Sequence, residues 1–361
     1  MSIADALKAI AAAESSLQEA RLALEGTQEG FADVVFDDWV RPESYKPTSE
    51  TNQDGAFRFF ANFAKFGRFD PIVYPGQDDA GHLHMFWGNT EINPHSTHES
   101  LTQSGHSSGQ GDMINRSAYW TPALLFGDTA WVPDFINNYY KMPDARRATN
   151  PWPDTAARQV GMPAGIKMVF GNPMNVKTWA EIKYAERVKY LIDSPELTTS
   201  SSNPADILPL LKPGQKFSVM VWSDNLWNGE LDSPDHRSHL AAAKYNIKTG
   251  KYEAPATHNY MIPQTTFIVS YTVPDGIDLS TLRCSSDMPG VQPLLNFHAD
   301  YMEAWHPTAS KMWFENAILR RLSCSHCDFG NGFAGKEPVG FKMKAEPNLI
   351  PMDHAATGHI H

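Results

Sequence analysis

The sequence contains little of what nucleic-acid binders, membrane proteins and disulfide-stabilised domains depend on. Its 361 residues include only three cysteines, which are too few for a disulfide framework. The formal net charge is −11 and lysine and arginine do not cluster, whereas nucleic-acid binding needs a basic surface. No apolar run approaches the length of a membrane span. These absences predict a chain with no nucleic-acid partner and no membrane span.

Motifs with an assignable chemistry are also scarce. The sequence has no glycine-rich phosphate loop and no His-Glu-x-x-His zinc motif, which argues against nucleotide-binding and zincin classes. Its one cysteine motif, Cys324-Ser-His-Cys327, has no second pair at the usual spacing to complete a four-ligand zinc site. The motif can be half of a metal site, a redox pair or an ordinary loop.

Apolar residues are plentiful, at 42% of the sequence, and they predict the fold class. Short apolar runs bounded by Gly, Pro, Asn and Asp are typical of strands, and they occur at 57–69, 82–87, 118–126, 166–170, 217–222 and 266–273. Helices are predicted at 177–192 and within 298–321. We therefore predict a mainly β fold with α additions, a β-sandwich-like core and long loops. This β-rich domain spans 57–335, between a linker at 27–56 and an extended tail at 336–361.

Residues 1–26 are predicted to form a separate amphipathic helix. Its apolar residues recur at heptad spacing, as in a short coiled coil: Ile3, Ile10, Leu17 and Leu24. The alternative is a helix that lies on its own domain. Because so short a helix is marginal alone, we expect a homo-oligomer or a larger assembly. No secretion signal opens the sequence, so we expect a cytoplasmic protein at synthesis.

Two histidine pairs are spaced so that both members share one face. His82 and His84 stand two residues apart in an alternating apolar run, the spacing of one strand face. His236 and His239 follow a Ser-Pro step at 233–234, which predicts the start of a helix. Their i, i+3 spacing would then place both imidazoles on one helical face. A metal or acid–base site is built from such pairs.

Six blocks of the sequence, in this order, resemble the DUF1996 family. This domain of unknown function occurs in secreted fungal and actinobacterial proteins, often beside WSC or other carbohydrate-binding modules. The resemblance covers roughly residues 57–320. The blocks are Arg68-Phe-Asp-Pro-Ile-Val-Tyr-Pro-Gly76, His82-Leu-His84, Ser117-Ala-Tyr-Trp-Thr-Pro122, Pro163-Ala-Gly-Ile-Lys-Met168, Trp227-Asn-Gly-Glu-Leu-Asp-Ser-Pro-Asp-His-Arg-Ser-His239, and Phe297-His-Ala-Asp-Tyr301 with Trp305.

The sequence departs from this family in two respects. Family members carry several cysteines near these blocks, whereas this chain has other residues there, such as Leu226 before Trp227. That loss fits a reduced or non-secretory setting. The N-terminal helix is foreign to the family and resembles the anchoring segments of phage virion proteins, which implies association with a virion. The family has no known activity, so the resemblance implies a fold and a site location but no reaction.

The matched blocks concentrate imidazoles and carboxylates. Taken singly, each can be structural, as a histidine bonded to a backbone carbonyl is. Together they are hard to bury, because each desolvated group needs its own partner. We therefore predict one divalent transition metal, Zn, Cu or Fe, with a metal-free acid–base cluster as the alternative. The predicted ligands are His82, His84 and His236 or His239, with Asp232 or Asp300 as a carboxylate ligand or an orienting group; the predicted catalytic groups are Asp232, Asp235, His298 and Asp300.

Aromatic residues beside these blocks predict the substrate class. Flat rings next to polar groups suit the faces of sugars, although core packing is the alternative. The predicted substrate-binding residues are Trp87, Tyr119, Trp120, Trp227 and Trp305. The sequence thus favours a metal-assisted or His/Asp acid–base enzyme that acts on polysaccharide. The alternatives are a non-catalytic glycan-binding surface protein anchored through its N-terminal helix, and a histidine network that only holds the loops together.

Overall fold

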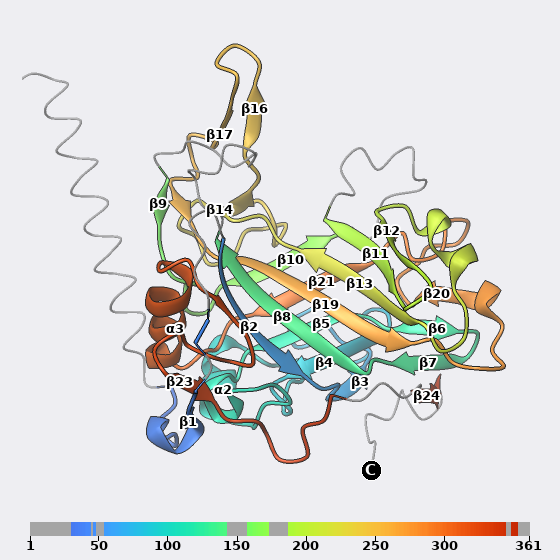
Figure 1. Cartoon of the computed structure of the whole chain (residues 1–361), viewed down its shortest axis with the longest axis horizontal. Helices are drawn as coiled ribbons and strands as arrows, with labels where there is room; N and C mark the ends of the chain where they lie inside the picture. Colours follow the sequence, from blue (N-terminus) through green and yellow to red (C-terminus); the bar gives the residue numbers. More distant parts are fainter. Residues whose placement is uncertain are drawn as a thin grey trace, which may run out of the picture.

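The structure is a computed structural model that describes residues 30–44, 46–47, 54–142, 157–172, 187–343 and 348–352. Strands dominate it and form several sheets (Figure 1). The described helical segments are all short. They are α2 (His98–Gln103), α3 (Pro307–Trp313), the π-helical turn η7 (Phe314–Ile318) and the 3-10 turns η1 (Phe36–Trp39), η2 (Asp112–Ile114), η4 (Pro204–Asp206), η5 (Leu208–Leu210) and η6 (Leu279–Thr281).

The largest sheet has seven strands in the order β12-β11-β13-β19-β8-β2-β22. Every pair in it is antiparallel except β2 and β22, which run parallel. Its strands are β2 (Gly55–Ala61), β8 (Phe135–Met142), β11 (Val188–Asp193), β12 (Thr198–Ser201), β13 (Lys216–Trp222), β19 (Gln264–Thr272) and β22 (Ser323–Cys324).

A second sheet has five antiparallel strands in the order β10-β21-β5-β4-β3. Its strands are β3 (Lys65–Gly67), β4 (His84–Gly88), β5 (Ala118–Pro122), β10 (Lys167–Gly171) and β21 (His298–Met302). Every residue of β4, β5 and β21 is buried, so both faces of this sheet are covered. Because β4 and β21 are each antiparallel to β5, they run in the same direction and begin at the same end of the sheet.

Smaller sheets extend the two large ones. Four strands form the order β20-β6-β7-β24, and four more form β15-β14-β18-β9. The remaining strands pair as β1 with β23 and β16 with β17. Their bounds are β1 (Val40–Pro42), β6 (Leu124–Phe126), β7 (Thr129–Val132), β9 (Arg158–Gln159), β14 (Leu226–Trp227), β15 (Leu240–Ala241), β16 (Lys244–Asn246), β17 (Lys251–Glu253), β18 (Tyr260–Met261), β20 (Leu282–Cys284), β23 (Phe333–Gly335) and β24 (Asn348–Pro351).

The main core lies between the two large sheets and is rich in aromatic rings. Phe267 of β19 packs edge-on against Trp87 of β4 and Tyr119 of β5, with ring centroids 5.1 and 5.5 Å apart. The hydroxyl of Tyr140 on β8 lies 3.0 Å from those of Tyr119 and Tyr301. All five side chains are fully buried. These contacts join the inner faces of the two sheets. The other face of the five-stranded sheet therefore packs against different residues.

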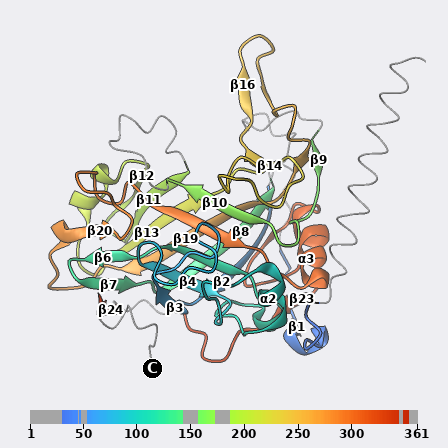
Figure 2. The same ribbon diagram turned by 180° about the vertical axis from the view of Figure 1, so that it is seen from behind.

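That outer face carries a smaller core of its own. Phe86 of β4 and Trp120 of β5 pack there with Ile72 and Leu101, which come from the segment between β3 and β5. The loops on either side of β4, the second of which includes α2, lie on the near side of the five-stranded sheet when the molecule is seen from behind (Figure 2). Thr97 caps α2 by accepting a hydrogen bond from the backbone N–H of Ser100. The segment between β4 and β5 therefore covers this face of the sheet.

The strand predictions are confirmed, because each of the six predicted runs contains at least one strand. The helix predicted within 298–321 is confirmed by α3, although the first part of that range is strand β21. The helix predicted at 177–192 is wrong where the structure describes it, since Val188–Asp193 is strand β11. Val188, Tyr190 and Ile192 are buried and alternate with more exposed residues, a period of two rather than 3.6. The helix predicted at 1–26 lies outside the described residues.

The segments on either side of the predicted domain also contribute strands. Within 27–56, η1 and β1 are formed, and β1 pairs with β23. Within 336–361, β24 pairs with β7. Across the described ranges, the helices are too short and too polar to span a bilayer.

The helix predicted from Ser233 is wrong, because residues 233–239 form turns. The hydroxyl of Ser233 accepts hydrogen bonds from the backbone N–H groups of Arg237 and His239. One carboxylate oxygen of Asp235 accepts from the N–H groups of Arg237 and Ser238 at 3.1 and 2.8 Å. His236 has a φ of 55°, which no α-helix contains. Short polar side chains here take the backbone donors that a helix would use.

Removing the ring that joins the two sheets tests this account of the core. We expect Phe267→Ala to lower the free energy of unfolding by about 3–5 kcal/mol, because it leaves a cavity between buried rings. The matched control is Phe333→Ala, since Phe333 is 47% exposed; we expect it to cost less than about 1 kcal/mol. Chemical denaturation measures both. Equal losses for the two variants would show that the sheets are not held together at Phe267.

Candidate metal centre

A pocket of about 460 Å³ opens at the end of the five-stranded sheet where β4 and β21 begin. Its inner wall is formed by Asp70, His82, His84, His298 and Asp300. Asp70 belongs to the loop after β3, and His82 directly precedes β4. The pocket therefore collects imidazoles and carboxylates from three segments, of which the one with His298 and Asp300 lies far from the other two in the sequence.

Strand pairing explains why these side chains meet. His84 is the first residue of β4 and lies opposite Pro122, the last residue of β5. Asp300 of β21 lies opposite Trp120 on the other side of β5, which brings His298, two residues earlier, level with Pro122. Because side chains alternate along a strand, His298 and Asp300 share a face. The sheet register thus places the imidazoles of His84 and His298 on either side of the end of β5.

The three imidazoles lie close enough to share a ligand. The ring centroids of His82 and His84 are 4.1 Å apart, and those of His82 and His298 are 5.1 Å apart. One ring nitrogen from each of the three lies within 4.8 Å of the others. The predicted closeness of His82 and His84 is confirmed, although only His84 belongs to the strand itself.

Backbone carbonyls fix the orientation of two of these imidazoles. Nδ1 of His84 lies 2.9 Å from the carbonyl oxygen of Phe69, and Nδ1 of His298 lies 2.9 Å from that of Asn296. Because a carbonyl oxygen can only accept, Nδ1 carries the proton in both rings, and Nε2 has a free lone pair. A histidine whose Nδ1–H is held in this way is oriented as metal ligands usually are.

Two carboxylates lie beside the imidazoles. Asp300 is fully buried, and neither of its oxygens has a hydrogen-bond partner in the described part of the chain. Its Oδ2 lies 3.8 Å from Nε2 of His298. One oxygen of Asp70 accepts hydrogen bonds from the N–H groups of Ile72 and Val73, both at 2.9 Å. Ligand atoms of Asp70, His84 and Asp300 also lie within 4.8 Å of one another.

Burial controls protonation in this cluster, because the charged forms lose their hydration. It lowers the pKa of His298 to about 3, and the nearby His84 adds to the shift. It lowers the pKa of His82 far below the usual range, again with help from the neighbouring imidazoles. Burial and the charge of Asp70 raise the pKa of Asp300 well above its usual value. At neutral pH the imidazoles are therefore uncharged, as metal binding requires.

These groups are suited to a single cation. The two ligand sets both contain His84, and Nδ1 of that residue is already bonded to a carbonyl. Only its Nε2 remains, so one ion would serve both sets. Nitrogen donors with one or two carboxylate oxygens suit Zn, Cu or Fe. In the described ranges, Nε2 of His82 and of His84 are buried without a hydrogen-bond partner, as expected of ligands whose partner is an ion.

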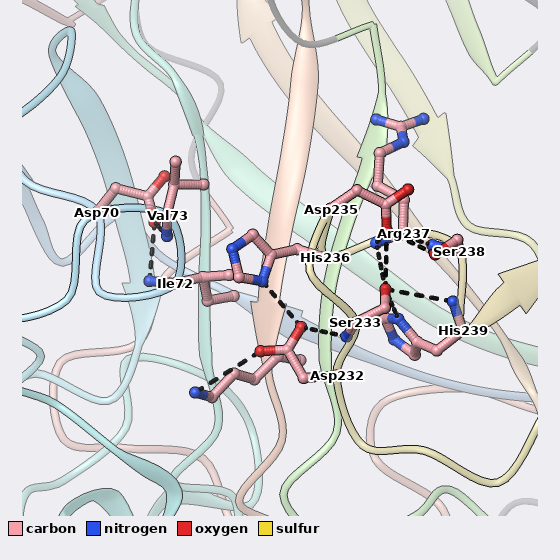
Figure 3. Close-up of polar contacts among 11 residues, drawn as sticks. Asp70, Ile72, Val73, Asp232, Ser233, Asp235, His236, Arg237, Ser238 and His239 are labelled. Atoms are coloured by element: carbon pink, nitrogen blue, oxygen red, sulfur yellow. Dashed lines mark hydrogen bonds and ion pairs between the residues drawn. The ribbon is translucent and has the colours of Figure 1, made fainter.

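The other predicted ligands lie in a separate hydrogen-bonded loop. Nδ1 of His236 is 2.8 Å from the carboxylate of Asp232, and Nδ1 of His239 is 2.9 Å from the hydroxyl of Ser233 (Figure 3). None of these four residues belongs to either ligand set within the described residues. The carboxylate of Asp235, predicted as catalytic, is engaged within its own turn.

This loop, residues 231–239, instead covers the free edge of β10. The N–H of Lys167 donates to the carbonyl of Leu231, and the N–H of Val169 donates to that of His236, at 2.9 and 3.0 Å. The guanidinium of Arg237 donates to the carbonyl of Gly171 at 3.0 Å. Since β10 pairs with β21, the loop supports the strand that carries His298 and Asp300.

The structure corrects the prediction that five aromatic rings bind the substrate. Trp87, Tyr119, Trp120 and Trp227 are fully buried, and Trp305 is 2% exposed. None of them lines the pocket. Trp87, Tyr119 and Trp305 pack in the core between the sheets, whereas Trp120 packs in the smaller outer core. A ring with no exposed face cannot stack on a sugar, so these residues stabilise the fold.

Two members of the cluster were not identified as ligands from the sequence. Asp70 precedes a proline, a position typical of turn residues, and it accepts hydrogen bonds from two following N–H groups. His298 was predicted as catalytic rather than as a ligand. The signal available in the sequence was the i, i+2 spacing of His298 and Asp300, the same spacing as that of His82 and His84.

The protonation of the cluster can be measured in chelator-treated protein. We expect nitrogen-15 NMR to show His84 and His298 as neutral rings with the proton on Nδ1. Because the pKa of His298 is about 3, this ring should stay neutral at about pH 5, where an ordinary histidine is mostly charged. Protonation of His298 between pH 7 and 5, or a proton on Nε2, would contradict the assigned geometry.

Comparison with known proteins places the chain in a family. A family model described as a domain of unknown function, DUF1996, matches residues 70–305, which is more than half of the chain. All five residues of the cluster lie within the matched range. No curated protein and no solved structure gives a significant match. The resemblance seen in the sequence is confirmed, and the chain belongs to the DUF1996 family.

Proposed function

We propose that this chain is a metal-dependent enzyme whose pocket binds one divalent transition metal ion. The ligands are His82, His84 and His298, with Asp300 or Asp70 as the carboxylate ligand. The observation that carries the proposal is the convergence of these imidazoles on a buried Asp300 that has no partner in the described chain. Burying such groups costs free energy, and a bound cation would recover it.

The residues of the chain support catalysis in addition to binding. A divalent ion in such a site supplies Lewis acidity, which polarises a substrate oxygen or lowers the pKa of water. The carbonyls of Phe69 and Asn296 hold two imidazoles in the ligand tautomer. If either Asp70 or Asp300 binds the ion, the other stays beside it and can accept a proton. We therefore propose a hydrolytic or other proton-transfer reaction at this pocket.

The pocket favours a catalytic over a purely structural ion. Structural zinc sites are closed by four protein ligands, whereas catalytic sites keep a position open to substrate. His82 is only partly buried and lines a pocket that opens to the surface. A polysaccharide substrate remains a prediction from the resemblance to the family, whose members accompany carbohydrate-binding modules. The buried aromatic rings do not support it.

Histidine variants test whether the ion binds at the His/Asp cluster or at the loop that contains His236, which was predicted from the sequence as a ligand. We expect wild-type protein to bind about one zinc ion, and His84→Ala and His298→Ala to weaken binding by at least about tenfold, because each removes a nitrogen ligand. His236→Ala is the matched control and should bind as wild type does. Elemental analysis and calorimetric titration measure this, with circular dichroism to verify the fold. Equal loss in His236→Ala, or no stoichiometric ion in folded wild type, would contradict the proposal.

A second part of the proposal concerns residues 1–26, which lie outside the described residues. Their heptad spacing supports association into a homo-oligomer or attachment to a larger assembly such as a virion. Shortly after them, the chain is fixed to the domain. Phe31 is buried, and both carboxylate oxygens of Asp33 pair with the guanidinium of Arg116, at 2.9 and 2.6 Å. The non-catalytic alternative, an anchored glycan-binding protein, predicts the same association but no metal-dependent reaction.

Deletion of residues 1–26 tests the association. We expect light scattering to show a lower oligomeric mass for the shortened chain than for the full chain, because the heptad residues are removed. Zinc binding should not change, since none of the proposed ligands belongs to residues 1–26. An unchanged mass would show that the segment does not drive association.

A further inference from the structure

The outer part of the metal pocket has a composition different from its inner wall. Two loops form it: one, between β3 and β4, contributes Val73 and Tyr74, and the other, after β20, contributes Met288 and Pro289. Val73 is 39% exposed and Met288 is 37% exposed, although both are apolar. Large apolar side chains beside a concave site are typical of ligand contacts.

The polar residues of the second loop are already engaged. The hydroxyl of Ser285 donates to the carbonyl of Leu83 at 2.6 Å, and that of Ser286 donates to the carbonyl of Asn296 at 2.9 Å. One carboxylate oxygen of Asp287 accepts from two backbone N–H groups, at 2.7 and 2.8 Å. These groups stabilise the loop and leave the apolar side chains facing the pocket. A bare sugar chain, which needs many hydrogen bonds, is poorly matched to this part of the site.

The two parts of the pocket therefore recognise different chemistry. The inner wall offers the proposed ion site and the buried carboxyl of Asp300, which has no hydrogen-bond partner in the described part of the chain. The outer part offers one aromatic ring, a polarizable methionine and aliphatic groups. A thioether and a phenol ring both pack favourably on an aromatic face. The volume of about 460 Å³ lies within the range of small-molecule sites, about 300–1,000 Å³.

We infer that the pocket takes a ligand with an oxygen-donor head, bound at the His/Asp cluster, and an aryl body, packed on Val73, Tyr74, Met288 and Pro289. This inference rests on the proposed function, because the head binds at the proposed ion site. It adds a substrate class: an aromatic compound or an aryl substituent of a larger molecule, with its reacting oxygen next to the aryl group. Tyr74 and Met288 are then positioning residues for the body and do not contact the reacting atoms.

A pair of hydroxamates with the same head tests this directly. Benzohydroxamate and acetohydroxamate differ in the aryl body alone, so their affinities for zinc-loaded full-length protein are compared by calorimetry. We expect benzohydroxamate to bind at least about tenfold more tightly, because burial of a phenyl ring is favourable. In a Val73→Ser/Met288→Ser double variant the ratio should fall to within about threefold. Met343→Ser is the control, since Met343 is 47% exposed and does not line the pocket.

A second readout keeps this inference separate from the metal proposal. With carbon-13-labelled methionine methyl groups, the Met288 resonance should shift with benzohydroxamate and hardly move with acetohydroxamate. Equal affinities in wild type, or no change in the ratio in the double variant, would overturn the aryl inference and leave the metal site intact. If the protein takes up no zinc, the metal proposal fails. In that case the Met288 methyl signal alone tests the aryl contact. If this signal does not shift with benzohydroxamate, the aryl inference is overturned as well.

Discussion

The burial of the uncharged imidazoles of His84 and His298, with the partly buried His82, beside a carboxyl group that has no hydrogen-bond partner among the described residues is the constraint on which the rest of the site depends. The free energy lost by desolvating these groups must be recovered by something that binds them together. His84 and His298 do not hydrogen-bond to each other, and each already uses its Nδ1 on a backbone carbonyl. Their Nε2 lone pairs can therefore accept from a hydrogen-bond donor or bind a cation. The single divalent ion that we propose would satisfy these groups together, because the ligand atoms within each of the two sets already lie within 4.8 Å of one another.

The same strands supply both stability and chemistry. Along β21, His298 and Asp300 face the pocket, whereas Tyr301 is stacked on Tyr119 in the core between the sheets. Along β4, His84 faces the pocket and Trp87 faces the core. A shift of the β5–β21 register by one residue would turn the ligands into the aromatic core. The packing of the inner face thus fixes the geometry of the outer face.

A feature of the fold or the site could be predicted from the sequence when it depends only on residues close together in the chain. The strands and the closeness of His82 and His84 follow from spacing within a few residues. The meeting of His84 with His298 depends on both strands pairing with β5, which no short pattern in the sequence specifies. At Ser233 and Asp235, local reasoning failed for another reason. Their side chains bind backbone N–H groups, so an apparent helix start became a turn. Trp87 and Trp120 were predicted correctly as parts of strands, but the pattern could not show that both faces of the sheet are covered.

X-ray absorption spectroscopy of the zinc-loaded protein tests the central claim most directly. It reports which atoms surround the ion, and it separates the His/Asp cluster from the cysteine pair Cys324 and Cys327, which are buried free thiols. The account predicts nitrogen and oxygen neighbours at about 2.0–2.2 Å with the scattering pattern of about three imidazoles. Sulfur neighbours at about 2.3 Å, or a shell without imidazole scattering, would contradict it.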